Sequence, residues 1–113
     1  MPMSRDLKVK AVTASTTQTQ AGGTVLNGDF NIATVANSSD AVTIPANLPT
    51  GTILFVVGGS NAGVIFPPVG GAINGGTVDA SKPLDASVVT MIVVTASGSS
   101  STYRANKLAA LSA

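Results

Sequence analysis

The chain has 113 residues, of which 44% are hydrophobic and 10% are charged, and its formal net charge is +1. The length fits a single domain, and the small net charge argues against general nucleic-acid binding. The sequence has no His, Cys, Glu or Trp, which excludes a disulfide framework and argues against an enzyme, since most acid–base and thiol chemistry and most transition-metal sites use these residues.

Residues 7–14, LKVKAVTA, alternate apolar and basic side chains. Leu7 and Val9 fall on one face of an extended segment, and Lys8 and Lys10 fall on the other. This pattern fits an extended arm or an edge strand that lysines protect from further pairing. Residues 15–23 have no apolar anchor and are expected to form a loop. We therefore expect an N-terminal arm and linker over residues 1–20, followed by a β domain over residues 21–104.

The middle of the chain alternates short apolar runs with turn signals. Strands are expected at residues 30–36, 41–45, 51–59 and 63–68, separated by Asn- and Pro-containing turns. In the first of these, Phe30, Ile32 and Thr34 share one face and Val35 lies on the other. The run 51–59, GTILFVVGG, is the most apolar and predicts a central strand buried on both faces.

The last third of the chain contains the strongest turn signal, Asn74-Gly75-Gly76, which predicts a tight hairpin between Ile73 and residues 77–78. Residues 82–85 are expected to redirect the chain, and residues 86–97 to form the longest strand. Residues 101–105 form the last expected strand, anchored by Tyr103. Residues 105–113 have some helical propensity and predict a C-terminal tail or a short helical turn.

Short strands at this spacing predict an all-β protein, either an antiparallel β-sandwich or a jelly-roll-like barrel of about seven or eight strands with an extended N-terminal arm. No clear internal repeat is present, so a solenoid is less favoured. The three Phe residues lie in different expected strands and are interpreted as core anchors. A stacking surface for nucleic acid would interleave such rings with basic side chains, which are missing there.

Basic residues gather at the two ends of the sequence, whereas four of the five Asp residues lie between them. The simplest interpretation is that both ends are solvated. The alternative is that a basic arm reaches an acidic surface on a partner or on a neighbouring copy. The candidate partner-contact residues are Arg5, Leu7, Lys8, Val9, Lys10, Arg104 and Lys107.

No motif indicates a catalytic, cofactor or metal site. The glycine pairs do not fit a phosphate-binding loop. Asp29 with Asn31, or Asp79 with Asp85, would offer oxygen ligands to Ca²⁺, but neither pair has EF-hand spacing. Ser and Thr are abundant without His or Glu as a base, so the usual hydrolase triads cannot form. The expectation is a protein that is not an enzyme and has no cofactor.

The first ten residues lack the apolar stretch of a signal peptide, and the longest apolar runs are shorter than the roughly 18 residues that a membrane span needs. The sequence therefore predicts a soluble protein made in the cytoplasm, without a membrane partner.

The run from Phe30, FNIATVANSSDAVTIPANLPTGTILFVVGGSNAGVIFPPVGGAINGG, resembles a module of small virion proteins of tailed bacteriophages. The similar features are an AVTIPA-like edge, a Pro-x-Gly turn, a valine-rich strand, an Asn-Ala-Gly turn, an FPP stop and an INGG hairpin. The resemblance spans residues 20–104. It departs in one respect, since many relatives have Trp near the end of the last strand, where this chain has Tyr103.

The resemblance implies a capsid decoration (cement) protein that binds the outer surface of the phage head and stabilises contacts between capsid subunits. Its partners would be the major capsid protein and other copies of itself, as a homotrimer, and its location would be the virion surface after synthesis in the host cytoplasm. The alternative is a head- or tail-fibre or receptor-binding module that recognises a host surface. The scarcity of aromatic residues argues against a glycan site of that kind.

Overall fold

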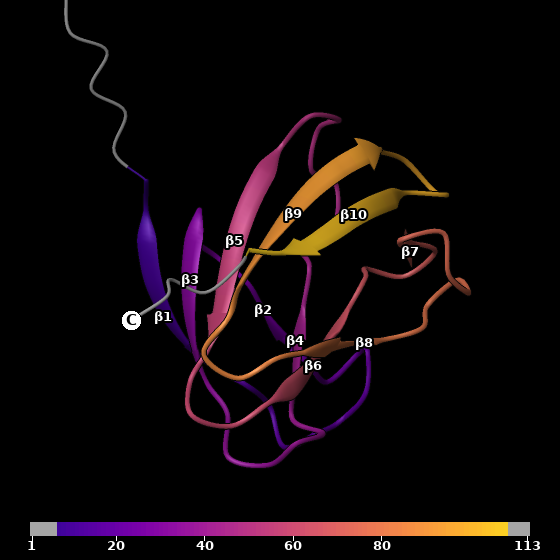
Figure 1. Cartoon of the computed structure of the whole chain (residues 1–113). Coiled ribbons are helices and arrows are strands. Elements are labelled where there is room, and N and C mark those ends of the chain that lie inside the picture. The colour runs from indigo at the N-terminus through magenta and orange to yellow at the C-terminus, as the bar shows by residue number, and fades with distance from the viewer. Residues whose placement is uncertain (1–6, 109–113) are drawn as a thin grey trace, which may run out of the picture.

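The computed structural model describes residues 7–108, which form ten strands in two sheets and no helix (Figure 1). The strands are β1 (Val9–Thr13), β2 (Thr24–Val25), β3 (Phe30–Thr34), β4 (Ala41–Thr43), β5 (Ile53–Gly58), β6 (Gly63–Phe66), β7 (Ala72–Ile73), β8 (Lys82–Leu84), β9 (Val89–Ala96) and β10 (Thr102–Lys107). The all-β fold class is confirmed.

The chain passes from one sheet to the other after each of its first eight strands. The six-stranded sheet has the order β1-β3-β5-β9-β10-β7, and the four-stranded sheet has the order β2-β4-β6-β8. Within the sheets, β1, β3 and β5 are parallel, and so are β2, β4 and β6. Residues 9–66 therefore form three successive coils, each of which adds one strand to each sheet.

The C-terminal strands close this arrangement with antiparallel pairs. β9 pairs antiparallel with β5 and with β10, and β8 pairs antiparallel with β6. β7 pairs with β10 in parallel, so five of the eight strand pairs are parallel. The expected antiparallel sandwich or jelly-roll is not confirmed. The turn at Asn27-Gly28 joins β2 to β3 and so carries the chain from one sheet to the other.

The structure contains the strands expected along the β domain, as β3, β4, β5, β6, β9 and β10, with two differences. Asn74 and Gly75 adopt φ of 55° and 70°, and the N–H of Gly76 donates to the carbonyl of Ile73 at 3.0 Å, so the predicted turn forms. The hairpin does not, because Ile73 pairs with Tyr103 instead of with residues 77–78. The short strands β2, β7 and β8 were not predicted.

Of the two alternatives expected for residues 7–14, an extended arm or an edge strand, the edge strand is found: residues 9–13 form an edge of the six-stranded sheet, and Val12 and Ala14 are buried in the common core. Residues 105–107 continue β10 and are not helical. The predictions for residues 1–6 and 109–113 fall outside the described residues.

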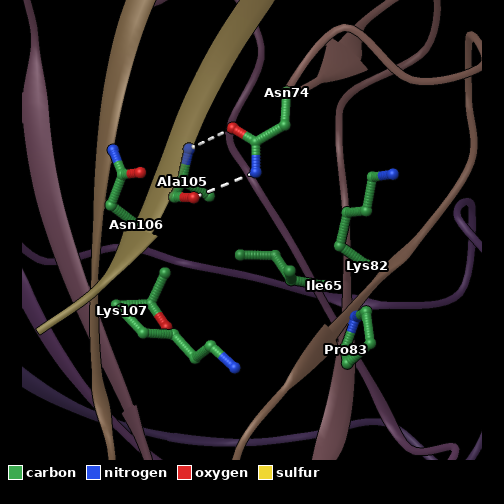
Figure 2. A pocket seen from close by; sticks show the side chains of 8 residues that line it. Ile65, Asn74, Lys82, Pro83, Ala105, Asn106 and Lys107 are labelled. Atoms are coloured by element: carbon green, nitrogen blue, oxygen red, sulfur yellow. Dashed lines mark hydrogen bonds between the residues drawn. The ribbon is translucent and has the colours of Figure 1, made fainter. Parts of the chain in front are cut away.

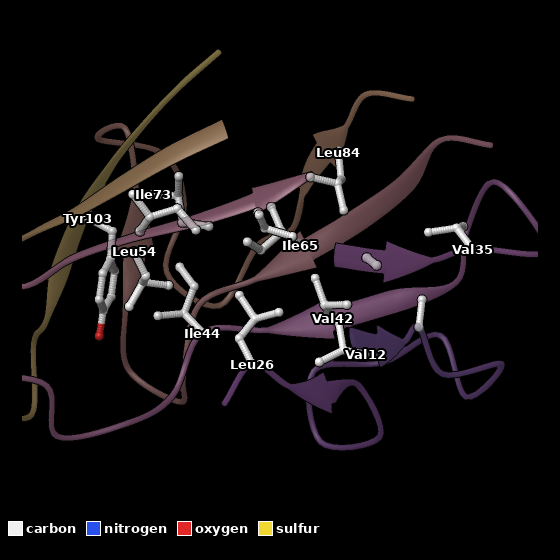
Figure 3. Close-up of a cluster of buried hydrophobic side chains, with 14 of the residues drawn as sticks. Val12, Leu26, Val35, Val42, Ile44, Leu54, Ile65, Ile73, Leu84 and Tyr103 are labelled. Atoms are coloured by element: carbon white, nitrogen blue, oxygen red, sulfur yellow. The ribbon is translucent and has the colours of Figure 1, made fainter. Parts of the chain in front are cut away.

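The hydrophobic core lies between the two sheets and is built from aliphatic side chains (Figure 3). Leu26, Ile44 and Ile65 are each 1% exposed, and Tyr103 extends the cluster at one end. The prediction that the Phe residues anchor the core is wrong, because all three are only partly buried. The alternation of side chains along a strand predicts which of them share a side of the sheet, but it does not predict which side faces the core.

A buried asparagine fixes the turn between β2 and β3. Asn31 is fully buried, and its Oδ1 accepts hydrogen bonds from the N–H groups of Gly28 at 3.0 Å and Asn27 at 3.3 Å. Its Nδ2 donates to the carbonyls of Gly28 at 2.9 Å and Phe55 at 3.0 Å. One side chain thus satisfies four backbone groups and ties the turn to β5.

The loop that joins β1 to β2 covers the outer side of β4 in the four-stranded sheet. The hydroxyl of Thr43 donates to the carbonyl of Gln20 at 3.2 Å, and the amide of Gln20 donates to the carbonyl of Pro67 at 2.8 Å. A Cβ on Gly23 would collide with the Thr43 side chain, so only glycine allows this close approach. The predicted loop over residues 15–23 therefore serves as a cover.

Candidate functional site

The outer side of the six-stranded sheet carries a continuous set of apolar side chains. Strand register places its members in three rows across the sheet. The first row is Ile53–Val93, the second is Val9–Phe30–Phe55–Met91, and the third is Ala11–Ile32–Val57–Val89. We call these ten residues the outer face. The row of Ile53 and Val93 continues onto β10 with Arg104, and the middle row continues there with Asn106.

Several of these side chains are exposed to an unusual extent for their type. Val9 is 58% exposed, Ile53 is 50% exposed and Ile32 is 47% exposed. The rings of Phe30 and Phe55 stack on each other with centroids 5.9 Å apart and an interplanar angle of 29°. This stacking shields part of each ring but leaves the pair at the centre of the outer face. Contiguous apolar surface of this kind marks an interaction site.

The strand β5 is apolar on both sides but is fully buried on only one of them. Its inner side chains, Leu54 and Val56, are buried, as the sequence predicts. Its outer side chains face away from the core, and the prediction of burial on both faces is wrong for Ile53. Near-continuous apolar strands are typical of sheets covered on both sides. β5 and β9 therefore have the composition of strands that are covered on both sides, although residues 7–108 bury only one side of them fully.

The outer face carries little charge. Among the described residues of β1, β3, β5, β9 and β10, Arg104 is the charged side chain that shares its side of the sheet. Threonines border the apolar rows: Thr13 and Thr34 at one end, and Thr95 and Thr102, whose hydroxyls are 2.7 Å apart, at the other. An apolar centre with an uncharged polar border is the usual anatomy of a protein interface.

The structure separates the residues that the sequence grouped as partner contacts. Val9 belongs to the outer face. Arg104 lies on β10, at the border of the outer face that is farthest from Val9. Lys8 and Lys10 alternate with Val9 and so point to the other side of β1, where both are exposed.

Two more of these residues lie apart from that group. Leu7 is 48% exposed just before β1. Lys107 forms an ion pair with Asp85 at 2.6 Å, so it contacts its own chain. Arg5 lies outside the described residues. Sequence reasoning found Val9 but missed the other apolar members of the outer face, because it assigned those strands to the core.

A hollow of about 320 Å³ lies where β8 approaches the end of β10 (Figure 2). Ile65 forms part of its floor, and Lys82 and Lys107 border it. Asn74 fixes one side, since its Nδ2 donates to the carbonyl of Ala105 at 3.0 Å and its Oδ1 accepts the Ala105 N–H at 2.9 Å. The hydrogen-bonding groups of Asn74 are thereby used within the fold. The lining contains neither a nucleophile with a base nor a set of metal ligands.

The acidic residue Asp79 serves the fold. The carboxylate of Asp79 accepts hydrogen bonds from the Gln20 amide at 3.0 Å and from the N–H of Gly70 at 2.7 Å. These two bonds, the one from Gln20 first, hold the pKa of Asp79 below its ordinary value. Within residues 7–108, no group of three or more potential ligand residues is placed to hold a metal ion. No helix in that range is long and apolar enough to cross a membrane.

Comparisons with known proteins leave the assignment to the residues themselves. No protein-family model matches the chain, and no curated protein or solved structure matches it either.

Proposed function

We propose that this chain is a structural virion protein, a capsid decoration protein that binds the outer surface of a phage head and stabilises contacts between capsid subunits. The resemblance of residues 20–104 to small virion proteins supports this assignment. The single structural observation in its favour is the outer face, because a contiguous apolar surface that residues 7–108 leave exposed suits a permanent assembly component better than a transient binder.

The proposed mode of action is binding by shape, with several copies acting together. In a homotrimer, the first contact with the capsid makes the following contacts intramolecular, which raises overall binding by about 10² to 10⁴. Weak individual contacts are then sufficient. No reactive side chain is needed, which agrees with the chemistry of a chain that has no His, Cys or Glu.

The proposed capsid contact is the basic side of β1. Lys8 and Lys10 remain exposed and point away from the outer face, so they stay accessible when that face is covered. Their positive charges would attract an acidic capsid surface and speed docking. Removal of residues 1–12 is a poor test, because it would delete most of β1 and its buried Val12.

The test is sedimentation of the purified protein with empty capsids. The unchanged chain is expected to sediment with capsids, and the double variant Lys8→Glu, Lys10→Glu to lose at least about tenfold in affinity. The variant Lys82→Glu is the control and should bind as the unchanged chain does. Failure of the unchanged chain to sediment with capsids, combined with binding to host cell envelopes, would replace this proposal with the host-recognition alternative.

A further inference from the structure

We infer that the outer face is an interface between copies of this chain, in which the apolar rows of one copy pack against the same rows of a second copy. The inference rests on the proposed function only for its setting, an assembly protein. It names the occupant of a surface that residues 7–108 leave exposed.

The two sheets are treated differently by their own chain. In the four-stranded sheet, residues 15–23 cover the outer side of β4, where Ala41 and Thr43 are 0% and 6% exposed. The outer face of the six-stranded sheet has no such cover among residues 7–108, and Val9, Ile32 and Ile53 remain about half exposed. Residues 7–108 therefore cover a central strand of one sheet and leave the outer face of the other exposed.

The size of the surface suits a stable interface. The four strands that carry the outer face give a width of about 19 Å, and five residues along each strand give a height of about 16 Å, so the projected area is about 300 Å². A standard interface buries about 800 Å² of accessible surface per partner, of which the apolar centre is only a part. The outer face supplies that centre, and the bordering threonines supply the polar rim.

The width also fits more than one arrangement of copies. Facing sheets pack about 10 Å apart, which two copies achieve by direct face-to-face packing. The four strands with apolar outer side chains, β1, β3, β5 and β9, span about 19 Å. Three such sheets around a three-fold axis would each lie about 5 to 6 Å from it, which is half the usual spacing between sheets. The proposed homotrimer is thus compatible with this interface.

Charge favours a second copy over a partner of opposite charge. The apolar rows are neutral, so two identical faces can approach without repulsion. Arg104 lies at the β10 side of these rows, where its guanidinium can remain in water. The lysines at positions 8 and 10 also disfavour pairing of two molecules along the β1 edge. Packing through the sheet face requires neither this edge nor its lysines.

The order in which partners become available also favours a second copy of the chain as the occupant of the outer face. A face reserved for a capsid would stay exposed from synthesis until assembly, and exposed apolar surface promotes aggregation. A second copy of the same chain is present as soon as the protein accumulates. A homo-oligomer therefore protects the face before any other partner is met.

The test compares two double variants that replace equally exposed apolar residues with lysine. Val9→Lys, Ile32→Lys changes the outer face, where the residues are 58% and 47% exposed. Val25→Lys, Val78→Lys is the matched control, because these residues are 54% and 56% exposed but lie in β2 and in the loop before β8. Light scattering after size-exclusion chromatography measures the mass of each purified protein at about 50 µM, and circular dichroism verifies that each is folded.

The unchanged chain and the control are expected to have the mass of two or more copies. The outer-face variant is expected to be a folded monomer, with a dissociation constant raised at least about 100-fold. If the outer-face variant fails to fold, the milder change Ile32→Thr serves instead. This variant should fold, since Thr suits a strand and Ile32 lies outside the core, and it should still weaken association measurably.

A monomeric unchanged chain, or an outer-face variant that keeps the full mass, would overturn the inference. These results are distinguishable from failure of the proposed function, because the mass is measured without capsids. An oligomer that ignores capsids would contradict only the proposed function. A monomer that binds capsids and loses this binding when the outer face is changed would mean that the capsid, not a second copy, occupies the face.

Discussion

The substitution Asn31→Ala should destabilise the protein by more than the loss of one hydrogen bond, although Asn31 lies outside the outer face. The alanine would leave two backbone N–H groups and two carbonyls without the partner they have now. Each hydrogen bond contributes about 1 kcal/mol net, and a buried group left unpaired costs about 1 to 3 kcal/mol. Water can reach the N–H groups in the turn, so the expected loss is about 3 kcal/mol.

Urea unfolding followed by circular dichroism measures this loss as a lower midpoint at an unchanged slope. The matched control is Asn61→Ala, which removes one hydrogen bond, from Nδ2 to the carbonyl of Val35 at 3.0 Å, and should cost about 0.5 to 1 kcal/mol. If the two variants lose equal stability, the network around Asn31 is not the unit that fixes the β2–β3 turn. A loss below about 1 kcal/mol for Asn31→Ala would refute the same reasoning.

Two further predictions concern the carboxylate of Asp79 and the first residue of β6, Gly63. The pKa of Asp79 is lowered by its hydrogen bond from Gln20 and by one from a backbone N–H. The ionised carboxylate therefore stabilises the fold above the unfolded-state pKa, and this stabilisation is lost as the pH falls through the folded-state pKa. An NMR titration of Asp79 should give a midpoint below 3.8, and Asp79→Asn should remove this acid-dependent loss of stability. Gly63→Ala should lower the free energy of unfolding, measured in urea, by about 1 to 3 kcal/mol, because its Cβ would lie 2.8 Å from the carbonyl oxygen of Asp40. The control is Gly59→Ala, whose Cβ has its nearest contact at 3.4 Å and which should cost less than about 1 kcal/mol.

The sequence predicted the strands better than their pairing. The runs that became β3, β5, β6 and β9 have strong local signals of β-branched residues bounded by Gly, Pro and Asn. Pairing depends on residues far apart in the chain, such as Phe30 with Phe55. The coil lengths vary, so no fixed period reveals the parallel arrangement, and turn signals look the same whether a turn joins neighbours or crosses between sheets.

The candidate site was harder to predict because its side chains resemble a core. Ile32, Ile53 and Phe55 belong to apolar runs that are typical of buried strands, and nothing local distinguishes burial by the same chain from burial by another molecule. One clue to an exposed apolar face was present in the sequence. β5 and β9 are largely apolar on both faces, and the chain has few other residues that could cover the second face. The basic residues were easier to identify, but their alternation with Val9 placed them on the opposite side of the sheet.

The alternation of the chain between its sheets has a consequence for how such a protein can change its length. Val9 pairs with Phe30 and Thr24 pairs with Val42, so one coil takes about 20 residues, and β1 and β2 of the same coil form an open edge of both sheets. Insertion or deletion of a whole coil at this edge would widen or narrow both sheets together in steps of about 4.8 Å and leave the closing strands β8, β9 and β10 in place. A change of one residue within a strand would instead exchange its inner and outer side chains. Variation in length is therefore expected in units of whole coils, and each unit would change the breadth of the outer face by one strand.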